Sequence, residues 1–342
     1  MARLAPYAER HEHKNLQGPG DARPTAAQIV EDQGLVASAD WTGRVVLITG
    51  CSPGGIGPET AKAIRLTGAD VYITSRDYAK GKQVAEELLA DSKPGKVEVI
   101  QMDLSSLKSI RAAANEFLQK SGHKLNILIE NAGVMACPKG RTEDGFETQF
   151  GTNYLGHFFL FHLLKDALLA SATPSFNSRV VVLASGAHRR GKINFDDLNF
   201  EKENTEYTPL GAYDQSKLAN VLFANELDRR YGSQNLHALS VHPGGILTPL
   251  ARYLPTTQDM MDDKQLYSTL KDPAQGAATT VWGAVAKEWE GKGGVYLDEV
   301  AEGWLAPSDA LYYHGGYAVQ AFDPPTETKL WDVSLKLIGS SE

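Results

Sequence analysis

The sequence predicts an α/β protein with a doubly wound parallel sheet of about seven strands and helices on both faces. Two observations predict this fold: short apolar runs alternate with helical segments, and a glycine-rich stretch separates the first run from the first helix. The chain has 342 residues, of which 42% are hydrophobic and 22% charged, so it can bury a substantial core. Continuous apolar strands of this kind are typical of parallel sheets buried on both faces.

The predicted strands begin after Trp41. They are Val45–Thr49, Val71–Thr74, Val97–Met102, Leu125–Glu130, Val180–Ala184, Leu236–Val241 and a shorter run at Gly294–Leu297. The predicted helices between and after them are Ile56–Thr67, Tyr78–Asp91, Leu107–Lys120, Gly145–Ser171, Tyr213–Tyr231 and Pro273–Lys287. Right-handed crossovers place the carboxyl ends of such strands, and hence a ligand, along one edge of the sheet.

Composition and charge exclude several classes of protein. The formal net charge is −8 and the pI near 5.6, and basic residues gather only in the pairs Arg189–Arg190 and Arg229–Arg230, so we expect no nucleic-acid surface. Cys51 and Cys137 form neither a disulfide framework nor a zinc spacing, which favours a reducing compartment. Residues 1–36 lack a long apolar run, and residues 155–170 combine apolar residues with histidines and charges. We therefore expect no signal peptide, no membrane span and a cytoplasmic location.

The stretch TGCSPGGIGPET, Thr49–Thr60, is typical of a phosphate-binding turn. In a Rossmann-type fold, the turn between the first strand and the first helix points backbone N–H groups and the helix dipole at a diphosphate. Glycines allow the close approach, and the stretch contains Gly50, Gly54, Gly55 and Gly57. One glycine-rich turn is weak evidence, but the second strand stops at TSRD, where the adenosine ribose of a dinucleotide is expected.

The end of the second strand distinguishes the two nicotinamide dinucleotides. An acid directly at the strand end favours the 2′-hydroxyl of NAD, whereas an arginine just past it pairs with the 2′-phosphate of NADP. Ser75, Arg76 and Asp77 occupy this position. We therefore expect NADP(H) in preference to NAD(H), while Asp77 argues for NAD and a solvated Arg76 remains the alternative.

Motifs along the chain resemble, in order, those of the short-chain dehydrogenase/reductase family. They are TGCSPGGIG (from Thr49), ENAGVM (Glu130–Met135), TNYLGHF (Thr152–Phe158), LASGAH (Leu183–His188), YDQSK (Tyr213–Lys217) and HPGGILT (His242–Thr248). The resemblance covers residues 41–297 and is strongest to the retinol-dehydrogenase-like and WW-domain-oxidoreductase-like branch. A Tyr-x-x-x-Lys pair alone arises by chance, but six motifs in order are a specific signal.

The resemblance implies a catalytic set of Asn153, Ser185, Tyr213 and Lys217. Hydride transfer at a carbinol carbon requires a proton to leave or join the oxygen, and a tyrosine serves near neutral pH if positive charge lowers its pKa from about 10. Lys217 follows Tyr213 by one helical turn and can supply that charge. By resemblance, Tyr213 is the acid/base and Lys217 also holds the nicotinamide ribose. Ser185 would bind the reacting oxygen, and Asn153 a water that joins Lys217 to solvent. Taken singly, each has a structural alternative as a cap or a core residue.

The resemblance also implies a cofactor site. Asn131–Gly133 would lie by the adenosine ribose, Asp103 by the adenine, and Pro243–Thr248 on the nicotinamide side. The expected cofactor-binding residues are Gly50, Ser52, Gly55, Ile56, Gly57, Arg76, Asp103, Leu104, Asn131, Ala132, Gly133, Tyr213, Lys217, Pro243, Gly244, Ile246 and Thr248. No metal ligands are expected, and His157 and His162 are expected to be satisfied core or interface histidines.

The sequence departs from the family pattern in several places. The glycine turn is one residue longer than Thr-Gly-x-x-x-Gly-x-Gly, and we expect the extra Gly54 to be absorbed as a bulge. Glu130 replaces an asparagine common before Asn-Ala-Gly. Residues 186–212 form a long insertion, and Leu247–Leu270, with Leu250, Tyr253, Leu254, Met260, Met261, Leu266 and Tyr267, is expected to form an apolar lid or else an ordinary surface helix.

We expect a single domain with flanking segments. Residues 1–40 would form a polar N-terminal arm, in which His11–His13 belong to a mobile tail rather than a metal site. Residues 41–300 would form the dinucleotide-binding catalytic domain, and residues 301–342 a C-terminal extension that packs near the substrate cleft.

The function predicted is an NADP(H)-dependent oxidoreductase that interconverts a ketone or aldehyde and an alcohol on a lipophilic small molecule, such as a retinoid, a steroid or a secondary metabolite. The alternatives are a non-catalytic nucleotide-binding scaffold or regulator, and a lyase or epimerase on the same fold. A homodimer through Gly145–Ser171 and Tyr213–Tyr231 is left open, because the branch also includes monomers.

Overall fold

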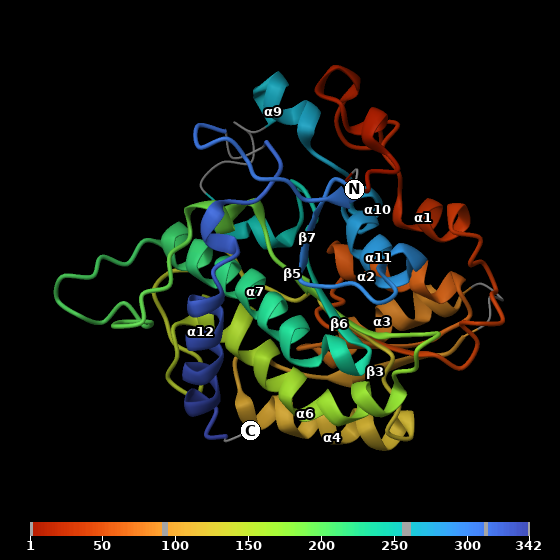
Figure 1. The fold of residues 1–342 in the computed structure, drawn as a ribbon, viewed down its shortest axis with the longest axis horizontal. Helices are drawn as coiled ribbons and strands as arrows, with labels where there is room; N and C mark the ends of the chain where they lie inside the picture. The colour runs from red at the N-terminus through yellow and green to blue at the C-terminus, as the bar shows by residue number, and fades with distance from the viewer. Residues whose placement is uncertain (1–2, 91–94, 255–260, 311–313, 341–342) are drawn as a thin grey trace.

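A central sheet organises the molecule (Figure 1). The computed structural model describes residues 3–90, 95–254, 261–310 and 314–340, and in those residues the sheet has eight strands in the order β3-β2-β1-β4-β5-β6-β7-β8. All pairs from β3 to β7 are parallel, and β8 is antiparallel to β7. The expected doubly wound parallel sheet is thus confirmed. The strands are β1 Val45–Ile48, β2 Asp70–Ser75, β3 Val97–Gln101, β4 Ile127–Glu130, β5 Ser178–Leu183, β6 Leu236–His242, β7 Val295–Asp298 and β8 Ala301–Glu302.

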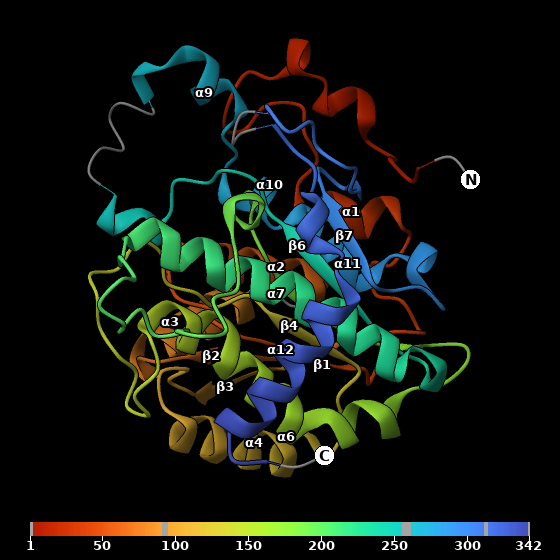
Figure 2. The same cartoon turned by 60° about the vertical axis from the view of Figure 1, so that its left-hand side comes forward.

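Helices cover both faces of the sheet (Figures 1 and 2). Those that contribute to the core on one face are α1 Ala26–Asp32, α2 Ile56–Leu66, α3 Tyr78–Leu89 and α11 Ala278–Val285. Those on the other face are α4 Leu107–Ser121, α6 Gly156–Ser171, α7 Pro209–Tyr231 and α12 Pro324–Leu337. Three shorter helices are α5 Thr148–Phe150, α9 Lys264–Thr269 and α10 Pro273–Gly276. No helix in the described segments is long and apolar enough to cross a bilayer.

Some helix boundaries differ from those predicted. The predicted helix Gly145–Ser171 is divided into α5, a π-helical turn at Gly151–Leu155 and α6. The helix α7 begins at Pro209, a full turn before Tyr213, because Thr208 caps it by accepting from Gly211 N (3.0 Å) and proline is favourable in the first turn. Tyr213 therefore lies inside a formed helix instead of at its end.

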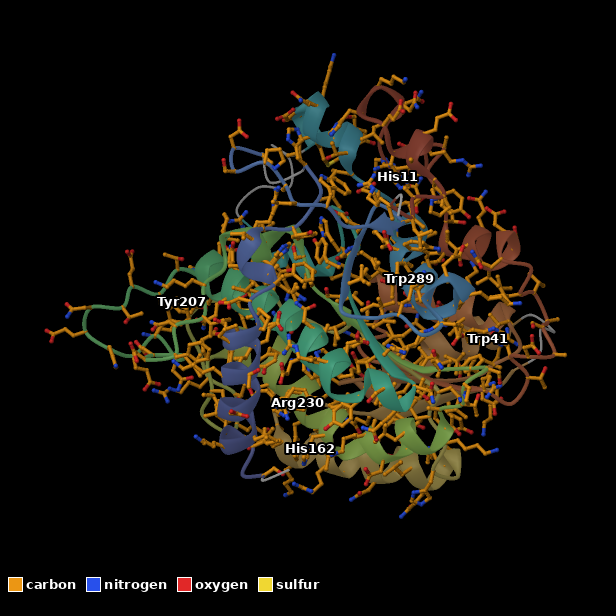
Figure 3. All side chains as sticks on the ribbon, viewed as in Figure 1. His11, Trp41, His162, Tyr207, Arg230 and Trp289 are labelled. Carbon is orange, nitrogen blue, oxygen red and sulfur yellow. The ribbon has the colours of Figure 1, made fainter. Side chains whose placement is uncertain are left out.

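The N-terminal segment is tied to the rest of the molecule. Thr25 and Gln28 form a capping box at α1, and Ile29 and Val30 are fully buried against α2 and α11. This segment also carries His11 (Figure 3). Its Nε2 lies 3.2 Å from a carboxylate oxygen of Glu299, in the turn between β7 and β8. The segment expected to be a polar arm with a mobile tail thus carries buried apolar residues and a long-range contact between His11 and Glu299.

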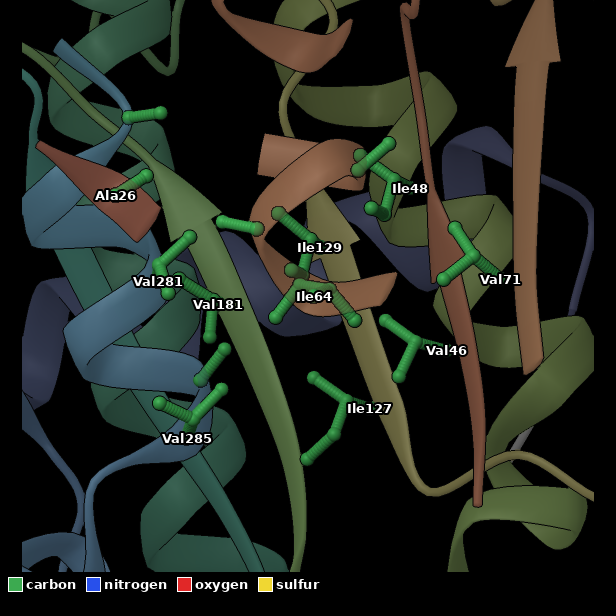
Figure 4. Close-up of a cluster of buried hydrophobic side chains, with 14 of the residues drawn as sticks. Ala26, Val46, Ile48, Ile64, Val71, Ile127, Ile129, Val181, Val281 and Val285 are labelled. Atoms are coloured by element: carbon green, nitrogen blue, oxygen red, sulfur yellow. The ribbon is translucent and has the colours of Figure 1, made fainter. Parts of the chain in front are cut away.

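Alternate strand residues point to opposite faces and form two apolar clusters. Val46, Ile48, Ile127 and Ile129 pack with Ile64 of α2 on one face (Figure 4). Their sequence neighbours Leu47 and Leu128 pack with α4, α6 and α7 on the other face. This alternation specifies the register in which neighbouring strands pair. The register in turn determines where each strand ends and where the residues that follow it lie.

The C-terminal segment covers one side of the molecule. α12 packs across α7 (Figure 2). On this face Trp331 packs edge-to-face on Phe158 of α6, with ring centres 5.1 Å apart. Before α12, Ala318 N donates to His188 Nε2 (3.4 Å) and Gln320 Nε2 donates to Arg189 O (2.8 Å). These contacts bring residues 318–320 next to the segment that follows Ser185.

Candidate active site

The expected site residues follow the carboxyl ends of neighbouring strands, so the fold gathers them along one edge of the sheet. Gly50 follows β1, Arg76 follows β2, Asp103 follows β3, Asn131 follows β4, Ser185 follows β5 and Pro243 follows β6. In open α/β sheets this edge, around the point where the strand order reverses, is where ligands bind. Here the reversal lies between β1 and β4.

The extra residue of the glycine turn forms a tight turn of its own. Gly55 N donates to Ser52 O (3.2 Å), which closes residues 52–55, and Gly54 has a φ of 76°. Proline at the second place and a positive-φ glycine at the third are the residues that suit a type II turn. α2 then begins at Ile56 with Gly55 as its N-cap, and no side chain in the described ranges caps it. The insertion is absorbed before the helix, so the first N–H groups of α2 remain available to an anion.

Two other glycines allow the turn to lie against the segment after β4. A Cβ on Gly50 would lie 2.6 Å from Ala132 Cα, and one on Gly57 would lie 2.7 Å from Gly50 O. Asn131 Nδ2 donates to Thr49 O (2.7 Å) and to Gly50 O (3.2 Å). Its Oδ1 is buried and has no partner among the described residues. These contacts hold the glycine turn against the segment after β4, and the buried Asn131 Oδ1 is the acceptor among them that no described residue satisfies.

Arg76 and Asp77 are both exposed but differ in their partners. Asp77 Oδ1 accepts from Lys80 N (3.2 Å) and thereby caps α3 Tyr78–Leu89. Arg76 is held by its backbone, whose carbonyl accepts from Gln101 Nε2 (3.1 Å), and no hydrogen bond or ion pair within the described ranges engages its guanidinium. The Asp77 carboxylate thus caps α3, whereas the Arg76 guanidinium remains available for a ligand.

The segment after β3 is held by a local turn. Asp103 Oδ1 accepts from Ser105 N (2.9 Å) and from Ser105 Oγ (2.7 Å). Leu104 is buried, and a Cβ on Gly156 would lie 2.6 Å from Leu104 O. This close approach of α6 keeps the segment at the same edge as the glycine turn.

Tyr213 and Ser185 form the centre of the candidate catalytic group. Burial raises the pKa of Tyr213 to about 12, and a side-chain hydrogen bond with Ser185 acts in the opposite direction. Ser185 Oγ also accepts from Ala187 N (3.2 Å) and so caps the short 3-10 helix that follows β5. The serine is both a cap and a neighbour of the tyrosine.

Lys217 extends from α7 Pro209–Tyr231 to the end of β5. Its Nζ donates to Leu183 O (2.8 Å) and lies 5.7 Å from the centre of the Tyr213 ring. Burial lowers the pKa of Lys217 to about 7. Burial is the main cause of both shifts and disfavours the charged form of each group, and the role of Lys217 in lowering the pKa of Tyr213 stays a prediction.

Asn153 lies in the π-helical turn that the sequence did not predict. Its Oδ1 accepts from Val134 N (2.8 Å), while its Nδ2 donates to Val134 O (2.9 Å) and to Ser216 Oγ (3.0 Å). Such turns widen a helix by one residue and are frequent at functional sites. The asparagine joins the segment after β4 to α7, and Ser216, which the sequence did not single out, completes that link.

His157 is a satisfied core histidine, as expected from the sequence. Its Nδ1 lies 2.9 Å from Asn153 O and its Nε2 lies 2.9 Å from Thr49 Oγ1. Burial lowers its pKa to about 4, so the ring is neutral at physiological pH. His162, the other histidine of this helix, also has a partner, Ser340 Oγ at 2.9 Å.

The loop after β6 carries the residues expected on the nicotinamide side. Gly244 has a φ of 101°, and Ile246 pairs with Lys271 as an isolated β-bridge. Thr248 Oγ1 accepts from Leu250 N (3.3 Å). The sequence did not identify Lys271, whose Nζ donates to Pro243 O (3.4 Å) and lies 3.2 Å from Glu299 Oε1. Of the expected lid, Leu266 and Leu270 are buried, Tyr253 and Met261 are about half exposed, and Met260 lies outside the described residues.

The geometry of this edge fits a nicotinamide dinucleotide. The uncapped start of α2 suits a diphosphate, and the unsatisfied Asn131 Oδ1 suits a ribose hydroxyl. The described residues contain no group of three or more His, Cys, Asp or Glu that could hold a metal ion.

Comparison of the sequence with known proteins gives the family. The family model described as short chain dehydrogenase matches residues 44–196. The chain is 46% identical over 327 residues to short-chain dehydrogenase/reductase prx1 of Penicillium roqueforti, covering 95% of this chain and 93% of that protein. It is 41% identical over 298 residues to retinol dehydrogenase 12 of Homo sapiens, covering 87% of each.

A solved structure is similar across almost the whole fold. An uncharacterized protein from Mycobacterium Paratuberculosis matches with a TM-score of 0.68 and 33% sequence identity, covering 94% of this chain and 99% of that one. The family resemblance expected from the motifs is therefore confirmed. The chain belongs to the short-chain dehydrogenase/reductase family and is a retinol-dehydrogenase-like oxidoreductase.

Proposed function

We propose that the chain interconverts a ketone or aldehyde and an alcohol on a lipophilic small molecule, with NADP(H) as its cofactor. The observation that supports this best is the convergence of Tyr213, Ser185 and Lys217 at the sheet edge that also carries the uncapped start of α2. When bound, the nicotinamide of NADPH supplies a hydride to the carbonyl carbon of the substrate. The residues of the chain supply and hold the proton.

Tyr213 is proposed as the acid in the reductive direction. A phenol with a pKa of about 12 is protonated at neutral pH, so it can donate its proton to the carbonyl oxygen as that oxygen gains negative charge. Ser185 Oγ, which hydrogen-bonds Tyr213, is proposed to donate to the same oxygen. Both groups are held by regular structure, Tyr213 within α7 and Ser185 two residues after the end of β5, as the N-cap of the 3-10 helix that follows.

Lys217 and Asn153 are proposed to support this pair. The Lys217 ammonium would donate to the nicotinamide ribose and, when charged, favour loss of the Tyr213 proton in the oxidative direction. Asn153 would hold the segment after β4 against α7 through Val134 and Ser216. The water expected at Asn153 would bind the remaining lone pair of the Asn153 main-chain carbonyl, because His157 Nδ1 already lies 2.9 Å from that oxygen.

Arg76 is the basis for preferring NADP over NAD. Its guanidinium is exposed and without a partner among the described residues, whereas Asp77, the argument for NAD, caps α3. The lipophilic substrate class is supported by the apolar residues of Leu247–Leu270 and by similarity to retinol dehydrogenase 12, whose name gives retinol as what it acts on.

The cofactor preference is tested by titrating the protein with NADPH and with NADH, using nicotinamide fluorescence. We expect Arg76→Ala to weaken NADPH binding by about 10- to 100-fold, the loss of a charge-assisted hydrogen bond to phosphate, and to leave NADH binding unchanged. Lys82→Ala, which removes an exposed cation from α3, is the matched control. Equal losses for both dinucleotides would contradict the role of Arg76.

Turnover is tested with a panel of lipophilic ketones and aldehydes, measuring NADPH consumed against alcohol formed. A one-to-one ratio distinguishes an oxidoreductase from a scaffold or from a lyase or epimerase. Tyr213→Phe is expected to lose at least about 1000-fold in kcat, because it removes the proton donor, while NADPH affinity stays within a few-fold. Retention of most of the activity would show that Tyr213 is not the acid.

A further inference from the structure

We call residues 17–23 the strap. The strap packs against residues 267–275, which belong to the segment between β6 and α11. The segment containing the strap lies beside α9 at the top of the molecule in both views (Figures 1 and 2). The strap precedes the region matched by the family model, residues 44–196. Its contacts therefore add to what the family motifs specify.

Arg23 makes the main contacts of the strap. Its side chain is 1% exposed and its Nε bonds Asp21 Oδ1 (2.8 Å). Its Nη1 donates to Thr269 O (2.8 Å), and its Nη2 donates to Leu270 O (2.5 Å) and to Gly18 O (3.2 Å). Thr269 and Leu270 lie at the end of α9 Lys264–Thr269, where helix carbonyls lack internal partners and carry partial negative charge. Arg23 thus acts as a cationic C-cap supplied from about 246 residues away in sequence.

Gln275 of α10 holds the strap from the other side. Its Nε2 donates to Asp21 O (3.1 Å) and to Arg23 O (3.2 Å), and its Oε1 accepts from Gly20 N (2.9 Å). The strap backbone also lies close to α9, since a Cβ on Gly18, whose φ is 100°, would lie 2.8 Å from Tyr267 Cε1. Backbone and side chain together fix the strap to residues 267–275.

The segment that the strap holds is paired with the loop after β6. Lys271 N donates to Gly245 O (2.8 Å), and Lys271 pairs with Ile246. A Cβ on Gly276 would lie 2.6 Å from Ile246 Cγ1 and 3.1 Å from Ile56 Cγ2, so α10 also packs on the first residue of α2. Residues 245–246 and residue 271 are therefore paired, and they flank the segment 247–270 that was expected to form a lid.

We propose that the strap is a positioning element of the oxidoreductase, in which Arg23 holds residues 268–271 so that the loop Pro243–Thr248 keeps the shape that binds the dinucleotide. This inference rests on the proposed role of that loop on the nicotinamide side. Arg23 does not touch the catalytic group, so its loss weakens binding of the dinucleotide and leaves the rate at saturation largely unchanged.

The test compares Arg23→Lys with Arg65→Lys. Arg65 is a matched control because it is also buried and donates to backbone carbonyls, those of Leu88 and Gly95, on the side of α2 away from the lid. Each variant is measured for thermal midpoint, NADPH Kd by fluorescence titration, and kcat at saturating NADPH. Gly18→Ala is a second variant, which displaces the strap from Tyr267 while leaving Arg23 in place.

We expect both lysine variants to lower the thermal midpoint, but Arg23→Lys and Gly18→Ala alone to raise the NADPH Kd, by at least about fivefold, with kcat within about twofold of the parent. An Arg23→Lys variant that binds NADPH as tightly as Arg65→Lys does would overturn the proposal. A parent protein that binds neither NADPH nor NADH would instead contradict the proposed function, so the two failures are distinguishable.

Discussion

Burial acts on the two central residues of the site in opposite directions. Tyr213 loses solvent around a group that ionises to an anion, and its pKa rises to about 12, while Lys217 loses solvent around a cation, and its pKa falls to about 7. At neutral pH the tyrosine is therefore protonated and the lysine about half charged. The pair thus holds its proton on the phenol, as a proton donor for a carbonyl requires.

The pKa of Lys217 predicts a pH dependence of cofactor binding. If the charged ammonium holds the dinucleotide, the apparent NADPH Kd should rise by up to about tenfold for each pH unit above 7, because the charged fraction of Lys217 falls in proportion. The NADPH Kd is measured by titration from pH 6 to 9. The same titrations with Lys217→Met, which cannot ionise at this position, show how much of the pH dependence comes from ionisation of NADPH itself. If the NADPH Kd of the parent and of Lys217→Met changed with pH in the same way, the Lys217 ammonium would not hold the dinucleotide.

Glu130 predicts a pH dependence of stability. Burial raises its pKa well above the usual range, and neither carboxylate oxygen has a partner in the described structure. Folding therefore favours the neutral form of this group, whereas the unfolded chain ionises it above a pKa of about 4.3, so its contribution to stability is full below that pH and is lost as the pH rises towards the folded pKa.

Glu130→Gln removes this ionisation. Relative to the parent, its free energy of unfolding should increase by up to about 1.4 kcal/mol per pH unit above 4.3, measured by urea unfolding at pH 5.5, 7.0 and 8.5. Glu203→Gln changes an exposed carboxylate and serves as control. A difference that does not depend on pH would show that Glu130 is charged in the folded protein.

At the scale of elements, the glycine turn shows how an insertion is accommodated without loss of a helix terminus. The hydrogen bond from Gly55 N to Ser52 O closes the Pro53–Gly54 turn, and α2 starts at Ile56. The sequence predicted a bulge at Gly54. The type of turn follows only from the structure, which shows that Gly55 N donates to Ser52 O.

Gly54→Ala tests whether this turn positions the start of α2. Its φ of 76° is unfavourable for alanine, and so is the φ of 70° at Gly291, where nothing lies within 4 Å of an added Cβ. We expect both substitutions to destabilise the protein by about 1–2 kcal/mol. Only Gly54→Ala should weaken NADPH binding, by about tenfold, in a fluorescence titration; equal affinities for both variants would exclude a role for the turn.

At the scale of the whole molecule, α12 closes the face formed by α6 and α7. Trp331 contacts Phe158, Phe161 and Phe223 through its ring and lies under the Arg230 guanidinium at 4.7 Å. The sequence left open a homodimer through these two helices. The structure shows that the C-terminal helix of the same chain packs on them.

Trp331→Ala is expected to lower the free energy of unfolding by about 3–5 kcal/mol, because it removes a buried aromatic side chain, and to increase self-association through the exposed rings. Urea unfolding and light scattering after gel filtration measure the two effects. Lys336→Ala, an exposed change on the same helix, should show neither. An unchanged stability would mean that α12 is only loosely attached.

Local patterns in the sequence determined the sheet and the positions of the site residues. Apolar runs predicted the strands from β1 to β7, and each motif residue that follows a run lies at the carboxyl edge, because strand ends in a parallel sheet share one edge. The same patterns predicted that His157 is a satisfied core residue. These inferences depend on periodicity and turn chemistry, which act within a few residues.

Tertiary structure alone decided the rest. Arg23 reaches Thr269, Lys271 reaches Glu299, and Trp331 reaches Phe158, and each contact joins segments that no local pattern connects. The pKa values of Tyr213 and Lys217 likewise depend on how much water the folded chain excludes, since both residue types are ordinary in sequence. Desolvation and long-range packing exist only once the chain has folded, which is why the sequence placed the candidate residues at one edge of the sheet but did not indicate the pKa values of Tyr213 and Lys217 or the contacts of the strap.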